Sequence, residues 1–211
     1  MSEKELSGAS IARMPVYLRC LQKKLSDGKR FVSSTELASD ALVSAVLVRK
    51  DLEKVSSLKG KPRIGFDVQR LITDIEKFLG YDNLTDAVIV GAGGLGRAFL
   101  SYEGFKQNGL NLVAGFDIDE KIVGTSVAGK PVYPVAELSS FVEREHIRIG
   151  IITAPKSAAQ EILDSMVAAG IKGVWNFAPV RLFAPKSVVI KNEDLSASFA
   201  LLVSGLYRRE E

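Results

Sequence analysis

The segment Asp86–Asp119 reads DAVIVGAGGLGRAFLSYEGFKQNGLNLVAGFDID, and its pattern decides the fold of the chain. A short apolar run, Ala87–Val90, leads into six residues of the form G-x-G-x-x-G. A helical pattern follows through Phe99 and Phe105, and a second apolar run ends at Asp117. Strand, glycine-rich turn, helix and strand in this order are typical of a dinucleotide-binding unit in a doubly wound parallel sheet.

The glycines of this turn have the chemistry of a phosphate site. A tight turn from strand to helix needs residues that tolerate positive φ, and a pyrophosphate approaches backbone N–H groups closely only where no Cβ intervenes. We therefore expect the pyrophosphate of a dinucleotide to contact the backbone of Gly91, Gly93, Gly94, Leu95 and Gly96. A packing turn that binds no ligand is the alternative.

Asp117 follows the last glycine by about twenty residues, the distance at which such units carry an acidic residue. A carboxylate there accepts hydrogen bonds from both ribose hydroxyls and repels a 2'-phosphate. The sequence thus predicts NADH and NAD as ligands rather than their phosphorylated forms.

Length and composition limit the possible classes of protein. A chain of 211 residues with 46% apolar content can bury one large core or two small ones. Its one cysteine, Cys20, cannot form an internal disulfide and falls within an amphipathic pattern, which favours a packed thiol in a reducing compartment. No apolar run reaches membrane-spanning length and the first residues lack a signal peptide's apolar core, so we expect a cytoplasmic protein with no membrane partner.

Positive charge is concentrated before the glycine-rich turn. Residues 1–80 carry 15 Lys and Arg against 10 Asp and Glu, whereas the rest of the chain carries 13 against 15. Apolar spacing predicts a helix over Ile11–Leu25, and the S-x-x-E pattern at Ser33 predicts a capped helix to about Ser39. A third, cationic helix follows Ser44, so we predict a helix-turn-helix.

The segment Ser56–Phe66 is rich in Gly, Pro and Ser and fits a β-hairpin wing. In a winged helix the third helix enters the major groove of DNA, while the wing meets phosphates or the minor groove. The candidate DNA-binding residues are Ser44, Arg49 and Lys50 on the helix and Lys59, Lys61 and Arg63 on the wing. The alternative is that these are ordinary surface cations.

The remaining pattern continues a doubly wound α/β fold. A capped amphipathic helix, Asp67–Leu79, bridges the two regions and ends at Gly80. The later elements that we predict are a connecting stretch around Val132, a helix Val135–His146, a strand Ile147–Thr153, a helix Pro155–Ala169, a strand Lys172–Asn176 and a late strand Val188–Ile190.

Ligands of such folds bind at the carboxyl ends of the parallel strands. This rule selects two further groups to flank the nicotinamide: Thr153, Ala154 and Pro155, and Asn176, Phe177 and Ala178. Small residues leave room for a flat ring, and the Asn176 amide would either hold the carboxamide or pin its own loop. Pro155 as a first helical residue and Asn176 as a turn residue are the alternatives.

The last segment, Glu193–Arg209, has apolar residues on nearly every side of a helix. Such a helix must be enclosed, and we predict that it packs into a partner subunit to form a homodimer. The alternative is a buried core helix within its own Rossmann domain.

The sequence carries no apparatus for turnover. The sole histidine, His146, falls at a polar helix end, and there is neither a Cys/His cluster for a metal nor a serine in a nucleophile-elbow pattern. We therefore predict a sensor with no metal rather than an enzyme.

The sequence resembles the Rex family of redox-sensing transcriptional repressors over nearly its full length. The matching motifs are Tyr17-Leu18-Arg19, Val32–Leu37, Val48–Leu52, Gly91–Gly96, Phe116–Asp119, Ala168–Gly173, Asn176–Pro179 and Asn192–Asp194. The resemblance implies a homodimer that exchanges its final helix between subunits, binds operator DNA when NADH is scarce and releases it when NADH binds. It also implies a redox switch of an arginine, a tyrosine and an aspartate, which fall on Arg19, Tyr102 and Asp194.

The predicted organisation is a winged helix-turn-helix over residues 1–80, a Rossmann-type NAD(H)-binding domain over 81–191 and a swapped dimerisation helix over 192–211. The wing departs from the family pattern, because Pro62 stands where an arginine is usual. The competing class is a small NAD- or CoA-binding enzyme or enzyme subunit, against which Asp117 and the N-terminal helices argue.

Overall fold

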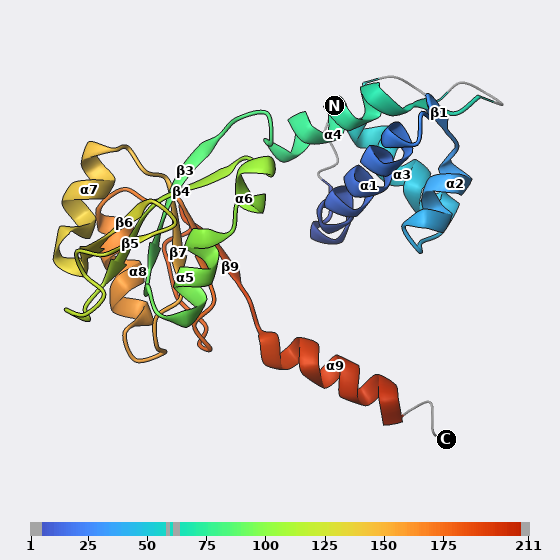
Figure 1. Ribbon diagram of the computed structural model, residues 1–211. Coiled ribbons are helices and arrows are strands. Elements are labelled where there is room, and N and C mark those ends of the chain that lie inside the picture. Colours follow the sequence, from blue (N-terminus) through green and yellow to red (C-terminus); the bar gives the residue numbers. More distant parts are fainter. Residues whose placement is uncertain (1–5, 58–59, 61–63, 208–211) are drawn as a thin grey trace. The chain divides into compact units, whose positions relative to one another are not determined.

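The computed structural model describes residues 6–57, 60 and 64–207, and the chain divides into two compact units, Met1–Asn83 and Leu84–Glu211 (Figure 1). The first unit contains α1 (Gly8–Ser26), β1 (Phe31–Val32), α2 (Ser34–Asp40), α3 (Ala45–Val55), β2 (Phe66–Asp67) and α4 (Val68–Leu79). The expected order of three helices followed by a capped amphipathic helix is therefore confirmed.

Local capping explains where the helices of the first unit begin. The Ser33 hydroxyl accepts a hydrogen bond from the Glu36 N–H at 3.1 Å, and the Glu36 carboxylate accepts one from the Ser33 N–H at 2.9 Å, so the predicted capping box is present. The Ser44 hydroxyl caps α3 by accepting from the Leu47 N–H. At the other end of the unit, Asp67 caps α4, which stops at Gly80 in the left-handed conformation.

The inner faces of these helices form one apolar core. Its fully buried members include Met14, Tyr17, Leu21, Leu37, Leu52, Leu71 and Ile75, which come from α1, α2, α3 and α4. Helices α2 and α3 are joined by the turn 41–44, where Leu42 takes a φ of +55° and is 92% exposed. The arrangement is a helix-turn-helix that packs against α1 and α4.

Strand β2 pairs antiparallel with β1, and Val32 lies opposite Phe66. Gly65 precedes this strand with a φ of +94°, and a Cβ there would lie 2.2 Å from the Val32 carbonyl oxygen, so only glycine fits. The predicted wing residues Lys59, Lys61 and Arg63 lie outside the described residues. The hairpin predicted for this segment remains a prediction.

The second unit is built on a sheet with the order β5-β6-β4-β3-β7-β8-β9. Its strands are β3 (Thr85–Val90), β4 (Leu110–Asp117), β5 (Ser126–Val127), β6 (Lys130–Pro134), β7 (Ile149–Ile152), β8 (Gly173–Asn176) and β9 (Val189–Asn192). All neighbours pair in parallel except β5 with β6. The order of the six parallel strands reverses between β3 and β7, as in dinucleotide-binding folds, and this confirms the doubly wound prediction.

Helices cover both faces of this sheet (Figure 1). Helices α5 (Gly94–Ser101) and α6 (Gly104–Gln107) lie on one face, and α7 (Leu138–Arg144) and α8 (Ala159–Ala168) on the other. An apolar core lies on each face of the sheet, and alternate residues of β3 belong to one or the other. Ala87 and Ile89 pack with Leu100 of α5, whereas Val88 and Val90 belong to the core under α7 and α8. Burial on both faces explains why this strand reads as a continuous apolar run.

Three predicted helix bounds are corrected. The helix expected from Pro155 begins instead at Ala159, because residues 155–158 form a separate turn in which the Ala158 N–H donates to the Pro155 carbonyl. The helical pattern through Phe105 breaks at Tyr102, whose ψ of 104° is extended, so α5 and α6 are separate. The predicted helix from Val135 begins with a 3-10 turn, Val135–Glu137, and α7 follows.

The last helix, α9 (Leu195–Tyr207), has no buried side chain among those described within the single chain. Phe199 is 66% exposed and Leu201 77% exposed, with Leu202, Leu206 and Tyr207 also open. The alternative of a core helix within its own Rossmann domain is therefore wrong. No helix in the described part of the chain is both long and apolar enough to cross a membrane.

Candidate functional site

The turn after β3 contains two glycines that the packing of the chain itself requires. Gly91 has a φ of +99°, and a Cβ there would lie 2.8 Å from the Ala154 nitrogen. A Cβ on Gly96 would lie 1.9 Å from the Gly91 carbonyl oxygen, which no side chain tolerates. These two glycines close the turn and hold the start of α5 against the end of β7.

The two glycines between them have a different environment. A Cβ built on Gly93 or Gly94 would meet no atom within 4 Å, and the φ of Gly93, −69°, suits any residue. No side chain caps the N-terminus of α5. Backbone N–H groups beside open space at a helix N-terminus are what an incoming phosphate requires, so the residues present fit a dinucleotide pyrophosphate.

Asp117 ends β4 beside this turn. One carboxylate oxygen accepts a hydrogen bond from the Ala92 N–H at 2.6 Å, and the other accepts from the N–H groups of Ile118 and Asp119 at 2.8 and 3.0 Å. A carboxylate has about four acceptor positions, so these three bonds leave about one, on the oxygen that accepts from Ala92, for a ribose hydroxyl. Asp117 therefore shapes the glycine turn and also places acceptor oxygens next to it.

Residues after β7 brace the turn from the other side. The Thr153 hydroxyl donates to the Gly91 carbonyl at 2.6 Å, and the Thr153 N–H donates to the Val90 carbonyl at 2.9 Å. Ala154 is nearly buried, whereas Pro155 is exposed. The structure thus brings Thr153, Ala154 and Gly91 together, as the strand-end rule predicts.

Asn176, at the end of β8, is fully buried. Its amide donates to the Val180 carbonyl and to the Asn192 side chain, both at 2.9 Å, and its amide oxygen accepts from the Ala178 N–H at 3.0 Å. Of the two roles that the sequence suggested, pinning the loop is the one observed. Contact with a carboxamide remains a prediction.

An aromatic cluster lines the face of the sheet that α5 and α6 cover, and sequence reasoning missed it. Phe177 packs edge-on against Phe99 with ring centroids 4.8 Å apart, and Phe99 stacks on Trp175 at 6.0 Å. Phe105 packs edge-on against Phe99, and Tyr102 packs against Phe105. The aromatic residues are visible in the sequence, but they belong to α5, α6 and the end of β8, and only the tertiary fold brings them together.

The three predicted switch residues lie at exposed positions. Tyr102 is 58% exposed, and its ring lies over Gly104, where a Cβ would come within 2.4 Å of the ring. Asp194 caps α9 by accepting from the N–H groups of Ser196 and Ala197. Arg19 is exposed on α1 in the first unit. Their joint role stays a prediction.

The candidate DNA-binding helix presents its cations outward. Ser44, Arg49 and Lys50 are exposed, whereas Val48, Asp51 and Leu52 are buried on the opposite face of α3. The adjacent residues Arg49 and Lys50 therefore both lie on the open side of the helix. That is the face a recognition helix needs.

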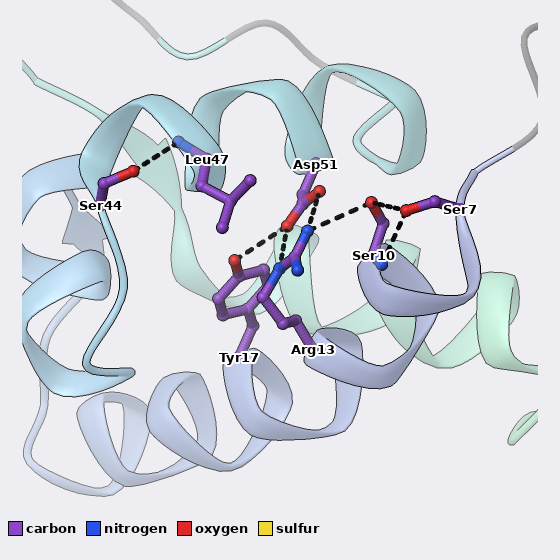
Figure 2. A network of polar contacts seen from close by, with 7 residues as sticks. All are labelled: Ser7, Ser10, Arg13, Tyr17, Ser44, Leu47 and Asp51. Atoms are coloured by element: carbon purple, nitrogen blue, oxygen red, sulfur yellow. Dashed lines mark hydrogen bonds and ion pairs between the residues drawn. The ribbon is translucent and has the colours of Figure 1, made fainter.

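A buried polar network joins α3 to α1, and sequence reasoning missed it (Figure 2). Arg13 Nε and a terminal nitrogen of Arg13 donate to the two oxygens of Asp51 at 2.7 and 2.9 Å. The Tyr17 hydroxyl donates to Asp51 at 2.9 Å, and Arg13 also donates to Ser10 at 3.2 Å. Nothing in the sequence pairs Arg13 with a carboxylate 38 residues away.

The network perturbs the ionisation of its members. Burial acts to raise the pKa of Asp51, but the hydrogen bonds from Arg13 and Tyr17 lower it below its ordinary value. Burial, together with the hydrogen bond to Asp51, raises the pKa of Tyr17 to about 12. Near neutral pH, Asp51 is thus charged, Tyr17 is neutral and Arg13 carries the compensating charge.

The described residues contain no group of three or more His, Cys, Asp or Glu that could hold a metal ion. A helix-turn-helix with an outward cationic face precedes a Rossmann sheet with an open glycine cradle. Together they define the class of DNA-binding proteins that carry a dinucleotide-responsive domain.

Comparisons with known proteins narrow this class. The family model described as "Putative DNA-binding protein N-terminus" matches residues 5–53, and the "CoA binding domain" model matches residues 82–180. The chain is 38% identical to the redox-sensing transcriptional repressor Rex of Treponema denticola over 200 residues, 95% of each chain, and 40% identical to that of Porphyromonas gingivalis over 193 residues, 92% of this chain and 88% of the relative. The chain belongs to the Rex family of redox-sensing transcriptional repressors.

Solved structures agree with this assignment. A crystal structure of RSP in complex with beta-NAD+ and operator DNA matches with a TM-score of 0.92 and 35% identity, covering 98% of this chain and 95% of RSP. RSP in complex with beta-NADH matches with a TM-score of 0.87 and 36% identity, covering 97% and 96%. The predicted family and the winged-helix and Rossmann fold class are confirmed, whereas exchange of the final helix between subunits remains a prediction.

Proposed function

We propose that this chain is a repressor that binds operator DNA through α3 and leaves it when NADH occupies the glycine cradle. One observation carries the proposal: a single chain combines open backbone at Gly93 and Gly94 with a recognition helix that exposes Arg49 and Lys50. RSP, which shares the fold over nearly the whole chain, has been crystallised with beta-NAD+ and operator DNA and with beta-NADH. The family consists of transcriptional repressors, so we assign no turnover.

Different residues of the second unit would bind different parts of the coenzyme. The cradle Gly91–Gly96 would hold the pyrophosphate through backbone N–H groups, and Asp117 would accept hydrogen bonds from the adenosine ribose. Residues Thr153, Ala154 and Pro155 after β7, with Asn176, Phe177 and Ala178 after β8, would border the nicotinamide. The coenzyme supplies a ring whose charge differs between its oxidised and reduced forms.

Regulation requires that NADH bind one arrangement of the two units better than another. A hydrogen-bonding side chain beside the ring can supply that difference, and Tyr102, Asp194 and Arg19 are the residues proposed for this. Allosteric coupling of about 1 to 3 kcal/mol would change DNA affinity roughly 5- to 150-fold. By linkage, operator DNA would weaken NADH binding by the same factor.

The exposed apolar surface of α9 supports a homodimer in which this helix packs against the partner subunit. We propose that residues 1–80 bind DNA, that 81–191 bind the coenzyme and that 192–211 dimerise. A DNA-bound repressor without a membrane-spanning helix among its described residues fits a cytoplasmic location.

The direct test measures DNA binding by fluorescence anisotropy at a fixed salt concentration. The operator would first be obtained by selecting duplexes from a random pool with the full-length protein. We expect nanomolar binding to the selected duplex, a fall in affinity of about fivefold or more on adding NADH and a smaller response to NAD. Failure to select any duplex, or equal affinity with and without NADH, contradicts the proposal.

A second candidate is CoA binding, because the model that matches residues 82–180 describes a CoA-binding domain. CoA carries a 3'-phosphate on its ribose, which a nearby carboxylate repels, so Asp117 argues against it. Titrations of NADH, NAD and CoA in parallel separate the two ligands. Tighter binding of CoA than of NADH would favour this second candidate.

A further inference from the structure

The ion pair between Arg13 and Asp51 lies against the inner face of the candidate recognition helix, with the Asp51 side chain 3% exposed and the Arg13 side chain 21% exposed (Figure 2). Asp51 is only 2% exposed, yet its two oxygens receive three hydrogen bonds at 2.7 to 2.9 Å. Arg13 is further held by Ser10, whose hydroxyl is 3.0 Å from that of Ser7, the cap of α1. Every buried polar side-chain atom among the described residues has a hydrogen-bond partner.

Stability alone does not account for such a pair. Burying the Asp51 charge and most of the Arg13 side chain costs free energy that their attraction offsets only partly, and well-packed apolar residues in such a place are often equally or more stabilising. The surrounding core already provides that environment, because Met14, Leu18, Val48 and Leu52 are buried nearby in the same cluster. Geometric specificity is the better explanation for keeping charges there.

The position of Asp51 on α3 indicates what this geometry controls. Asp51 lies on the inner face with Val48 and Leu52, while Arg49 and Lys50 lie on the outer face. Apolar contacts are non-directional and allow a short helix to roll, whereas a two-pronged guanidinium–carboxylate contact fixes orientation. A roll of about 10° would displace the helix surface by about 1 Å, enough to misalign hydrogen bonds to base edges.

We propose that Arg13, Asp51 and Tyr17 are positioning residues that set the rotation of α3, and hence which bases its outer face reads. They touch no DNA themselves and act through Arg49 and Lys50. The inference rests on the proposed function, because it assumes that α3 reads an operator. It assigns sequence discrimination, rather than overall affinity for DNA, to a network on the side of the helix that faces the core.

The test replaces the pair by apolar residues of similar volume, Arg13→Met with Asp51→Leu, in the full-length protein. Two affinities are measured: for the duplex selected by the wild-type protein and for a duplex of the same length and scrambled sequence. We expect the ratio of the two to fall about tenfold or more, which corresponds to about 1.4 kcal/mol. Affinity for the scrambled duplex, its salt dependence and NADH affinity should stay unchanged, because phosphate contacts and the cradle are untouched.

A control uses a second ion pair that α1 makes with the helix-turn-helix, between Lys24, whose side chain is 12% exposed, and Asp40, whose side chain is 41% exposed. Lys24 contacts Asp40 at 2.6 Å at the end of α2, away from the recognition helix. The variant Lys24→Met with Asp40→Leu should keep the wild-type ratio. An equal loss of discrimination in this control would show that any ion pair of the unit suffices, and the proposal would be wrong.

A conservative variant covers the case in which the apolar pair fails to fold. Arg13→Lys keeps the charge but loses the two-pronged contact, so it should remain folded in urea titration and still lower the ratio about threefold or more. If the wild-type protein selects no operator, the proposed function fails. If it does, and a folded variant of this pair discriminates within twofold of wild type, the positioning role is refuted.

Discussion

Gly93→Ala separates coenzyme binding from folding at the glycine turn. The structure shows open space around Gly93 and a φ of −69°, so the added methyl group meets nothing in the chain. We expect the free energy of unfolding to change by less than about 0.5 kcal/mol. The same methyl group would stand where a pyrophosphate must approach the backbone, so NADH binding should suffer.

The size of the loss follows from the bonds at stake. A hydrogen bond to a charged group contributes about 1.5 to 3 kcal/mol, and pushing the phosphate away from one backbone N–H would forfeit one such bond. This corresponds to NADH binding about 10- to 150-fold weaker. Calorimetric titration of wild-type and variant proteins with NADH, alongside urea unfolding, measures both quantities.

Gly96→Ala is the matched control. Its Cβ would lie 1.9 Å from the Gly91 carbonyl oxygen and 3.1 Å from the Thr153 hydroxyl, so this variant should lose stability first, by about 1 to 3 kcal/mol or more. The reasoning predicts opposite profiles for two glycines three positions apart. If Gly93→Ala bound NADH as tightly as wild type while remaining folded, the open cradle would not be the phosphate site.

Three further predictions concern other parts of the chain. Asp117→Asn keeps a side-chain acceptor for the Ala92 N–H but loses the negative charge. The ratio of NADH affinity to NADPH affinity, measured by parallel titrations, should therefore fall about tenfold. An unchanged ratio contradicts the ribose role of Asp117. Phe199→Glu with Leu206→Glu should convert a dimer into a monomer in analytical ultracentrifugation, whereas a dimer that survives both changes shows that α9 is not its interface. The hydrogen bonds that Glu36 accepts from the Ser33 N–H and from Lys29 lower its pKa from 4.5 to about 2. The ionised group therefore stabilises the fold fully above pH 4.5, and this contribution is lost as the pH falls through about 2. Glu36→Ala should cost about 0.5 to 1 kcal/mol at pH 7 and clearly less at pH 2 by urea titration, and an equal cost at both pH values would contradict this.

Local signals in the sequence were sufficient for most of the fold. The capping box at Ser33 and the helix stop at Gly80 each act over three or four residues, so the linear sequence predicts them. The apolar run Val188–Ile190 also predicted a late strand, which the structure has as β9, parallel to β8. Fold class follows from such short-range patterns combined with the topological rules of parallel sheets.

Tertiary contacts decided what the sequence could not show. Pro155 is a favourable first helical residue, yet its turn is separate and α8 begins four residues later. The chain is extended at Tyr102, between α5 and α6, and the tyrosine ring lies over Gly104. Arg13 and Asp51 meet only because the tertiary fold brings α1 and α3 near each other. Each of these features depends on a partner that is remote in sequence or on the space a neighbour leaves.

Hydrogen bonds connect the candidate coenzyme site after β8 to the residues that precede α9. Trp175 donates from its indole nitrogen to the Glu193 carboxylate at 2.9 Å, and the Glu193 N–H donates to the Asn176 carbonyl at 2.8 Å. The Asn176 side chain in turn holds Asn192, immediately before the residues that lead into α9. Any shift of the loop after β8 toward a nicotinamide ring must stretch these bonds or move the start of α9 with it. If α9 packs against a partner subunit, as proposed, such a shift would also move the contact between the subunits.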